Sequence, residues 1–353
     1  MRDSGKTLII FPGALGDFVC FLPALQRLAG EAQAELLARA EYGDLLPSNV
    51  VTRSLECYEI SRLFVSGGEG EKRLKKFFAS YQAVFSWMGS GQPDFVTRLS
   101  ALCQGKSRVF PFYPPEPGRH IADYYLSCLD KDCDSVQKPL AAISLKSEAL
   151  DWCGELWKQL GLERRKILAL APGSGAREKN WPADGYKAVI EWWEKAVGGK
   201  CIVVLGPVEE ARGQINDFSA SGIPMRNLKL AQLAALLSRC DLYLGNDGGV
   251  SHLAAALGAE TVALFGPTDP ARWRPRGRSV TVMTLNVECS PCSSEIMKSC
   301  SHRKCLTSLR PGDVIETLEQ LLAGTTAFEV EFSGELPDYG EARKSVDRQQ
   351  TIR

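Results

Sequence analysis

The sequence predicts an α/β protein with two Rossmann-like domains facing each other across a cleft. Short runs rich in Val, Ile and Leu alternate with helical stretches, as in parallel sheets covered by helices on both faces. The order of strand, glycine loop and helix also occurs twice, beginning at KTLIIF (6–11) and at KILALAP (166–172). The chain has 353 residues, which is long for one domain of about 150 residues. Ligands of such sheets bind at the carboxyl ends of the strands, so we expect the site in the cleft.

The first half is expected to contain five strands. They are predicted at 6–11, 34–38, 62–65, 82–87 and 106–110. Pro23 should kink the helix that follows the first glycine loop, or shorten its first turns. The Pro-rich segment 111–120 is predicted to be a loop, and 145–165 a helix that leads into the second half.

The second half repeats this pattern up to a polar tail. Strands are predicted at 166–172, 200–206, 223–228, 241–245 and 260–266, and helices at 183–197, 208–219, 231–240, 249–258 and 312–324. We therefore expect one Rossmann-like domain over residues 1–150 and a second over 151–324. Residues 325–353 carry many charges and few apolar side chains, and we expect this tail to be loosely packed or disordered.

The charge balance argues against some partners. Lys plus Arg and Asp plus Glu both total 42, whereas nucleic-acid-binding proteins usually carry a basic surplus. The polar N-terminus does not resemble a secretory signal, and no run reaches the roughly 18 apolar residues of a membrane span. We expect a cytoplasmic protein that does not bind nucleic acid.

The segment NDGGVSHLAAALG (246–258) predicts an anion site. It places Gly248 and Gly249 between a strand and a helix, where backbone N–H groups of the first helical turn lack partners. His252 could add a donor toward a phosphate, and Asp247 could accept from a ribose or sugar hydroxyl. The structural alternatives are that Asp247 is only an N-cap and that His252 is a satisfied first-turn side chain.

Three further loops at strand ends carry side chains that could bind a ligand. In PGSGAREKNWP (172–182), the Ser174 hydroxyl and the positive charge of Lys179 could bind a phosphate. GPVEEARG (206–213) offers Glu209, with Glu210 adjacent, either as acceptors for ribose hydroxyls or as first-turn carboxylates that complement a helix dipole. GPTDPARWRPRGR (266–278) offers Thr268 and Arg272 to phosphate or acceptor, although a solvated basic loop would look the same.

The first glycine loop, PGALGD (12–17), places a carboxylate at the carboxyl end of the first strand. Asp17 could act there as a general base, with Gly13 and Gly16 close to phosphate or acceptor. The alternative is that Asp17 caps its own helix.

Four of the twelve cysteines cluster near the C-terminus. Cys289, Cys292, Cys300 and Cys305 have the spacing C-x2-C-x7-C-x4-C, which suits a structural tetrahedral zinc. An iron–sulfur cluster, reduced thiols and disulfides are the alternatives. The other eight cysteines are expected to be free thiols of a reducing compartment.

GALGDFVCFLPALQRL, APGSGAREKNWP and NDGGVSHLAAALGAETVALFGPTDPARWRP together resemble glycosyltransferase family 9, the ADP-heptose:lipopolysaccharide heptosyltransferases and their relatives. The resemblance extends from about residue 6 to 323. It implies a GT-B fold, in which residues 1–150 bind the acceptor and residues 151–324 bind the nucleotide sugar. It also implies an inverting transfer that needs no metal and no cofactor, with Asp17 as base and Lys179 on the donor phosphate. It also assigns donor contacts to Ser174, Glu209, Asp247, Gly249 and His252. The family usually has Thr where this chain has Gly248, so a hydroxyl contact is lost there.

The expected function is transfer of a sugar, heptose from ADP-heptose in particular, to a lipopolysaccharide-core or similar lipid-linked glycan. The residues themselves fit this chemistry, because one carboxylate could deprotonate the acceptor while Lys179 and a helix N-terminus bind the leaving diphosphate. The alternatives are a nucleotide-sugar 2-epimerase of the same architecture and a non-catalytic nucleotide-sugar-binding relative. The nucleotide, sugar and acceptor stay open from sequence, as does the oligomeric state.

GEKRLKKFF (70–78) combines four cations with two phenylalanines at helical spacing. It is either a solvated helix face or a peripheral contact with the inner face of the inner membrane.

Overall fold

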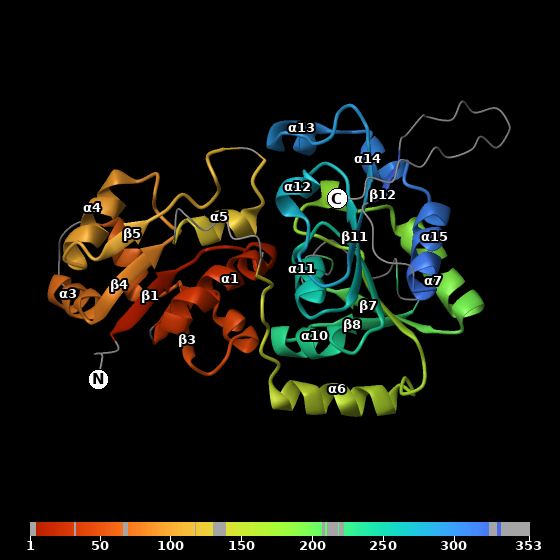
Figure 1. Ribbon diagram of the computed structural model, residues 1–353, viewed down its shortest axis with the longest axis horizontal. Helices are drawn as coiled ribbons and strands as arrows, with labels where there is room; N and C mark the ends of the chain where they lie inside the picture. The colour runs from red at the N-terminus through yellow and green to blue at the C-terminus, as the bar shows by residue number, and fades with distance from the viewer. Residues whose placement is uncertain are drawn as a thin grey trace. The chain divides into compact units, whose positions relative to one another are not determined.

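The computed structural model describes residues 5–31, 33–65, 70–116, 118–129, 139–206, 209, 218, 222–324 and 330–332. The chain divides into two compact units, Met1–Lys146 (unit 1) and Ser147–Arg353 (unit 2). Each unit contains one parallel sheet with helices on both faces, as Figure 1 shows. The predicted α/β class is therefore confirmed.

Unit 1 is built on a five-stranded sheet in the order β3-β2-β1-β4-β5, with every pairing parallel. The strands are β1 (Lys6–Ile10), β2 (Ala34–Ala38), β3 (Val50–Ser54), β4 (Tyr81–Ser86) and β5 (Ser107–Val109). The chain runs outward from β1 to β3 and then returns to the other side of β1 with β4. The carboxyl ends of β1 and β4 therefore form the switch point of this sheet.

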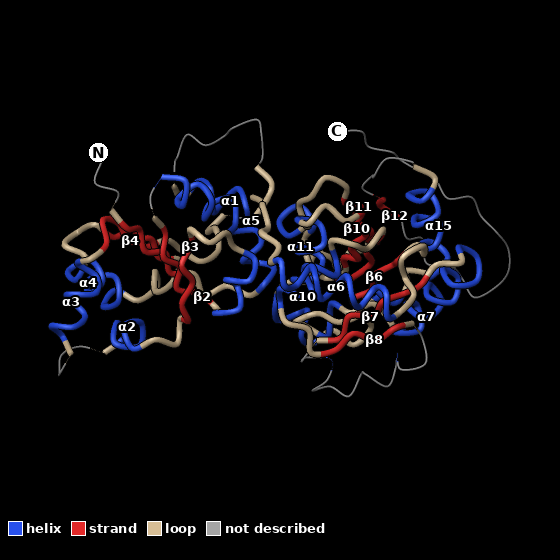
Figure 2. The backbone as a smooth tube through the Cα atoms, turned by 90° about the horizontal axis from the view of Figure 1, so that it is seen from below, coloured by secondary structure: helices blue, strands red, loops and turns tan. Residues whose placement is uncertain are grey.

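Helices cover both faces of this sheet (Figure 2). One face carries α1 and α5, and the other carries α3 and α4. The helical elements of unit 1 are α1 (Leu15–Glu31), η1 (Ala40–Leu45), α2 (Tyr58–Ser61), η2 (Arg62–Phe64), α3 (Glu71–Ala79), α4 (Pro93–Leu102) and α5 (Ile121–Ser127). An aromatic cluster packs inside, with Phe11 stacked on Phe21 at 4.2 Å between ring centroids and Tyr125 edge-on to both rings.

Unit 2 is built on a seven-stranded sheet in the order β12-β11-β10-β9-β6-β7-β8, again parallel throughout. The strands are β6 (Ile167–Ala171), β7 (Lys200–Leu205), β8 (Ile223–Arg226), β9 (Leu242–Asn246), β10 (Glu260–Phe265), β11 (Val280–Leu285) and β12 (Val330–Phe332). All five residues of β6 and all five of β9 are buried, because helices cover both faces of the centre of the sheet.

Helices α7 and α15 lie on one face of this sheet, and α10 and α11 lie on the other with α6 packed against α10 (Figures 1 and 2). The helical elements are α6 (Ser147–Gln159), η3 (Arg177–Lys179), α7 (Ala183–Trp192), η4 (Trp193–Val197), α10 (Leu230–Leu237), α11 (Gly249–Ala256), α12 (Pro270–Trp273), α13 (Ser294–Ser299), α14 (Lys304–Thr307) and α15 (Pro311–Leu322). Of the predicted helix 208–219, all but residues 209 and 218 lie outside the described part of the chain.

Several expectations about single elements are wrong. The run 62–65 is not a strand: Arg62–Phe64 form a 3-10 turn in which only Leu63 is buried, so it lacks the two-sided burial of a central strand. Val50–Ser54, which was not predicted, forms the edge strand β3, where exposed residues are tolerated. Helix α1 continues through Pro23, so its first turns are not shortened, while the kink expected at Pro23 stays a prediction.

The tail beyond residue 324 is not wholly irregular. Val330–Phe332 pair in parallel with β11 as strand β12, at the edge of the sheet. An edge strand needs partners on one side only, so a short segment within a charged tail can supply it. The remaining residues of 325–353 lie outside the described part of the chain.

Candidate functional site

The candidate donor site lies at the switch point of the sheet in unit 2. Strands β6 and β9 are neighbours, but the chain leaves β6 toward β7 and β8 and leaves β9 toward β10 and β11. The loops after β6 and β9 therefore turn away from each other at the carboxyl edge of the sheet, where α/β proteins bind ligands.

The side chain of Asn246, the last residue of β9, forms hydrogen bonds to both ends of the loop that follows β6. Its Nδ2 donates to the carbonyl oxygen of Pro172 at 2.7 Å, and its Oδ1 accepts from the backbone N–H of Trp181 at 2.8 Å. The side chain is 1% exposed, so these bonds are shielded from water. Sequence reasoning did not assign Asn246 a role, although an amide at a strand end beside Asp-Gly-Gly was a usable signal.

Asp247 joins three loops. Its Oδ2 accepts from the Lys179 ammonium at 2.7 Å and from the Thr268 hydroxyl at 2.6 Å. Asp247 is 5% exposed and Lys179 is 24% exposed at the side chain, so the ion pair is partly buried. Asp247 is not the N-cap of α11, because Gly248 holds that position without a side-chain cap. The structure thus brings together three predicted site residues, Lys179, Asp247 and Thr268.

Ser174 organises the same loop from within. Its hydroxyl lies 2.7 Å from the Ala176 carbonyl oxygen and 2.6 Å from Asn180 Oδ1. It also lies beside Gly248, where an added Cβ would be 3.5 Å from the Ser174 Cβ.

The N-terminus of α11 follows directly after Asp247. The helix begins at Gly249, and His252 closes the first turn by donating its backbone N–H to the Gly248 carbonyl at 3.3 Å. The His252 side chain is 4% exposed, and burial lowers its pKa from 6.5 to about 4. Burial is the largest contribution to this pKa shift; Asp247 opposes it, and Lys179 adds a smaller contribution in the same direction as burial. His252 is therefore neutral at pH 7 and can offer a single ring N–H, but no positive charge.

Glu209 lies between the ends of β7 and β6. Its Oε2 accepts from the Gly206 N–H at 2.8 Å, and its carboxylate occupies the space where Gly173 would carry a Cβ. Gly173 is therefore required for this close approach. Glu210 lies outside the described residues.

Arg272 belongs to the short helix α12, which Asp269 caps by accepting from the Ala271 N–H at 2.9 Å. Its guanidinium carbon lies 5.2 Å from the centroid of the Trp273 ring. This stacking orients Arg272 at the end of the loop that carries Thr268.

In unit 1, Asp17 lies in the first turn of α1, and its side chain is half-buried. Its Oδ2 accepts from the Ala14 N–H at 3.3 Å, so the predicted capping alternative has structural support. Burial raises the pKa of the Tyr125 hydroxyl, and the Asp17 carboxylate raises it further. The preceding Gly13 accepts from the Tyr42 hydroxyl at 2.9 Å and has no room for a Cβ beside Phe11, while Gly16 is half-buried.

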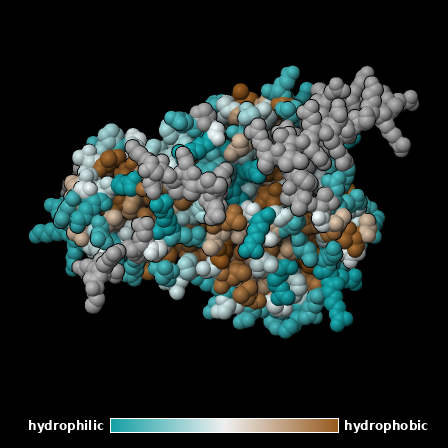
Figure 3. All heavy atoms as spheres, viewed as in Figure 1, coloured by the Kyte–Doolittle hydropathy of each residue, from teal (hydrophilic) through white to brown (hydrophobic). Residues whose placement is uncertain are grey.

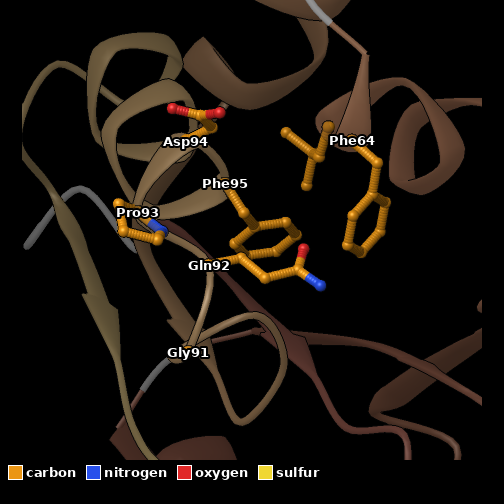
Figure 4. Close-up of a pocket in the computed structure, with 7 residues that line it drawn as sticks. Phe64, Gly91, Gln92, Pro93, Asp94 and Phe95 are labelled. Atoms are coloured by element: carbon orange, nitrogen blue, oxygen red, sulfur yellow. The ribbon is translucent and has the colours of Figure 1, made fainter.

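A separate pocket of about 310 Å³ lies between η2 and the start of α4 (Figure 4). The rings of Phe64 and Phe95 are 5.1 Å apart there, with the Gln92 side chain beside them. None of the predicted site residues lines this pocket.

The four clustered cysteines are free thiols in the region between β11 and α15. Burial raises the pKa of Cys305 to about 11, and the other three thiols raise it further, so the four lie within electrostatic reach of one another. Among the residues that the structure describes, however, no three His, Cys, Asp or Glu side chains are grouped as they would be around a metal ion.

Comparison with known proteins identifies the family of the chain. Residues 124–302 match the model of glycosyltransferase family 9 (heptosyltransferase). The lipooligosaccharide heptosyltransferase 2 of Campylobacter jejuni is 29% identical over 170 residues, which are 45% of this chain and 51% of that protein. The chain thus spans about half the length of the curated relatives it first matches.

Two solved structures share the fold. The glycosyl transferase family 9 protein from Veillonella parvula superposes with a TM-score of 0.71 at 20% identity, covering 92% of this chain and 99% of that one. The ADP-heptose lps heptosyltransferase II of E. coli superposes with a TM-score of 0.66 at 19% identity, covering 90% and 99%. Both superpositions cover the sheets of unit 1 and unit 2, which identifies the fold as GT-B. With half of the sequence matched by the family model, the chain belongs to glycosyltransferase family 9.

Proposed function

We propose that the protein is an inverting glycosyltransferase that transfers heptose from ADP-heptose to a lipopolysaccharide-core or similar lipid-linked glycan. The observation that carries the proposal is the meeting of Lys179, Asp247 and Thr268 beside the N-terminus of α11 at the switch point of unit 2. Family membership and the relatives named for heptosyl transfer support the donor class.

In this proposal unit 2 binds the nucleotide sugar. The Lys179 ammonium has three N–H donors, and Asp247 uses one of them, which leaves donors for the oxygens of the diphosphate. The first-turn amides of α11 add a positive dipole end. Asp247 orients Lys179, and Ser174, Glu209 and His252 complete the wall of the site. Thr268 and Arg272 stand at its phosphate side.

Unit 1 would bind the acceptor and supply the base. Asp17 accepts the proton of the acceptor hydroxyl while that oxygen bonds to the anomeric carbon, and the bond from this carbon to the diphosphate oxygen breaks. Attack on the face opposite the leaving group inverts the configuration. ADP departs with the electron pair, and Lys179 and the α11 N-terminus stabilise its charge, an effect worth about 3 kcal/mol per well-placed donor.

A thermal-shift panel tests the donor. ADP and ADP-heptose should raise the melting temperature, since a ligand that binds only the folded state stabilises it, and UDP- and GDP-linked sugars should not. Equal shifts with all nucleotides, or none with ADP-heptose, would contradict the proposed donor.

Two substitutions test the division of roles. Asp17→Ala should abolish turnover and keep ADP affinity, whereas Lys179→Ala should weaken ADP binding at least tenfold. Lys187→Ala, at an exposed ion pair with Asp184, is the matched control and should change neither. A nucleotide-sugar-binding protein without transferase activity would show no turnover to lose.

We also propose a peripheral contact between α3 and an anionic membrane surface at the cytoplasmic face. Lys72, Lys75 and Lys76 are exposed on this helix, and Figure 3 shows hydrophilic side chains gathered over it. Among the described residues no helix is long and apolar enough to cross a membrane. Flotation with phosphatidylglycerol vesicles should capture the wild type and lose the triple Lys→Gln variant; equal flotation would contradict the contact.

A structural zinc on Cys289, Cys292, Cys300 and Cys305 is proposed from their spacing and their mutual electrostatic influence. The thiols would have to draw together, because they are not grouped around a common point. Metal analysis of the purified protein should give about one zinc per chain. Four reactive thiols and no bound metal would contradict this proposal.

A further inference from the structure

The segment between β11 and α15, residues 287–309, contacts two of the three loops that Asp247 joins, the loop after β6 and the loop after β10. We call it the cysteine segment, because it contains the four clustered cysteines. It also contains the helices α13 and α14. None of the roles proposed above explains these contacts.

One group of contacts fixes the loop after β10. The Ser290 hydroxyl donates to the Gly266 carbonyl oxygen at 2.6 Å, and the Cys292 backbone N–H donates to the Pro267 carbonyl oxygen at 2.7 Å. Leu306 packs so closely that a Cβ on Gly266 would lie 2.5 Å from it. These contacts hold the two residues directly before Thr268.

A second group fixes the loop after β6. Arg303 Nη1 lies 3.3 Å from the Arg177 carbonyl oxygen and 3.4 Å from the Asn180 carbonyl oxygen. The Arg303 guanidinium thus contacts the backbone carbonyl groups of Arg177 and Asn180, which lie on either side of Lys179 in the sequence. At the end of this loop the Trp181 indole N–H donates to the Leu309 carbonyl oxygen at 3.0 Å.

The backbone of Arg303 has an unusual conformation. It has φ 44° and ψ 39°, the left-handed region that residues with a Cβ seldom adopt. Its N–H donates to the Cys300 sulfur at 3.4 Å, and its carbonyl oxygen accepts from the N–H groups of Leu306 and Thr307, both at 2.9 Å. The cysteine segment therefore fixes the direction in which the guanidinium extends.

We propose that Arg303 is a positioning residue for the donor site. Through Arg303 and the contacts on Pro267, the cysteine segment sets the separation of two loops, and this separation brings Lys179 and Thr268 to the same oxygen of Asp247. This role rests on the proposed function, in which that group binds a nucleoside diphosphate.

The test replaces the side chain and keeps the backbone. Arg303→Asn removes the guanidinium, while asparagine tolerates left-handed φ better than most residues. Isothermal titration with ADP should show a Kd about tenfold higher, and Arg303→Lys should recover part of the loss. In turnover assays the KM for the donor should rise and the KM for the acceptor should not. Arg164→Asn, at an exposed position of unit 2, is the control and should behave as the wild type.

Hydrogen exchange provides a readout that does not depend on the ligand. The N–H groups of Lys179 and Asn180 donate within their loop to the Ala176 and Arg177 carbonyl oxygens, and they should exchange faster in Arg303→Asn. Unchanged exchange together with unchanged ADP affinity would overturn the role of Arg303. If the wild type binds no ADP, the proposed function fails, and exchange at these amides alone decides whether Arg303 positions the loop.

Discussion

At the residue scale, a single carboxylate oxygen, Oδ2 of Asp247, connects the loops of the candidate donor site. It accepts from Lys179 and from Thr268, which lie 68 and 21 residues away in the sequence. A network of polar groups in a poorly hydrated site costs little folding free energy only when each group has a hydrogen-bond partner. The ammonium of Lys179 is thereby held in place before any phosphate arrives, which is the kind of preorganisation that electrostatic catalysis requires.

His252 should make stability depend on pH. Its pKa is lowered to about 4 in the folded protein, so between pH 6.5 and 4 the unfolded chain binds a proton that the folded one does not. Each pH unit in this window removes about 1.4 kcal/mol of unfolding free energy, about 3 kcal/mol in all, and none is removed above pH 6.5. Urea titrations at pH 7 and pH 4 should show a smaller loss for His252→Gln. The same loss in both proteins would show that His252 is not the titrating group.

Two buried tyrosines of unit 1 form a matched pair. The Tyr42 hydroxyl donates to the Gly13 carbonyl oxygen, whereas the Tyr125 hydroxyl has no hydrogen-bond partner among the described residues. Tyr42→Phe should lower the free energy of unfolding by about 1 kcal/mol, and Tyr125→Phe should leave it unchanged or raise it. Chemical denaturation measures both. A larger loss for Tyr125→Phe would show that its hydroxyl has a partner, such as the Asp17 carboxylate.

At the scale of elements, sequence reasoning works best where burial is two-sided. The strands β1, β6, β7, β9 and β10 are found within one or two residues of their predicted positions, because their apolar runs are buried on both faces. The edge strands β5 and β8 were also predicted, but two other edge strands were missed: β3 has only Val50 buried, and β12 lies in the charged tail. Their pairing depends on a neighbouring strand, which the local sequence does not encode.

The candidate site could also be predicted only in part from the sequence. The sequence placed Lys179, Asp247 and Thr268 at strand ends, but it could not show that they share one oxygen, because that depends on which strands are neighbours. It left Asp247 open between a cap and a ligand, and only the partners of its carboxylate decide against the cap. The proposed role of Arg303 rests on contacts to backbone carbonyl groups, which leave no motif in the sequence.

The start of α11 offers a substitution that adds a contact. Gly248 has an extended backbone with φ −167°, and a Cβ there would make ordinary van der Waals contact with Ser174. Gly248→Thr should therefore fold with an unfolding free energy within about 0.5 kcal/mol of the wild type, since Thr and Gly are similar N-caps. Its hydroxyl should lower the Kd for ADP about threefold. Weaker ADP binding, measured by titration, would mean that the diphosphate needs the space beside Gly248.

On the scale of the whole molecule, each unit repeats one plan. In unit 1 the first turn of α1, which follows β1, carries Asp17 near the switch point with β4. In unit 2 the loop after β6 carries Lys179 near the switch point with β9. In the proposed reaction, the carboxylate would deprotonate the acceptor and the cation would stabilise the leaving group.

A crystal structure of the complex with ADP tests the central claim most directly. The account predicts a diphosphate oxygen within hydrogen-bond distance of Lys179 Nζ, and another at the first-turn amides of α11. ADP bound elsewhere, or a Lys179 ammonium still directed only at Asp247 while the phosphates contact neither group, would contradict it.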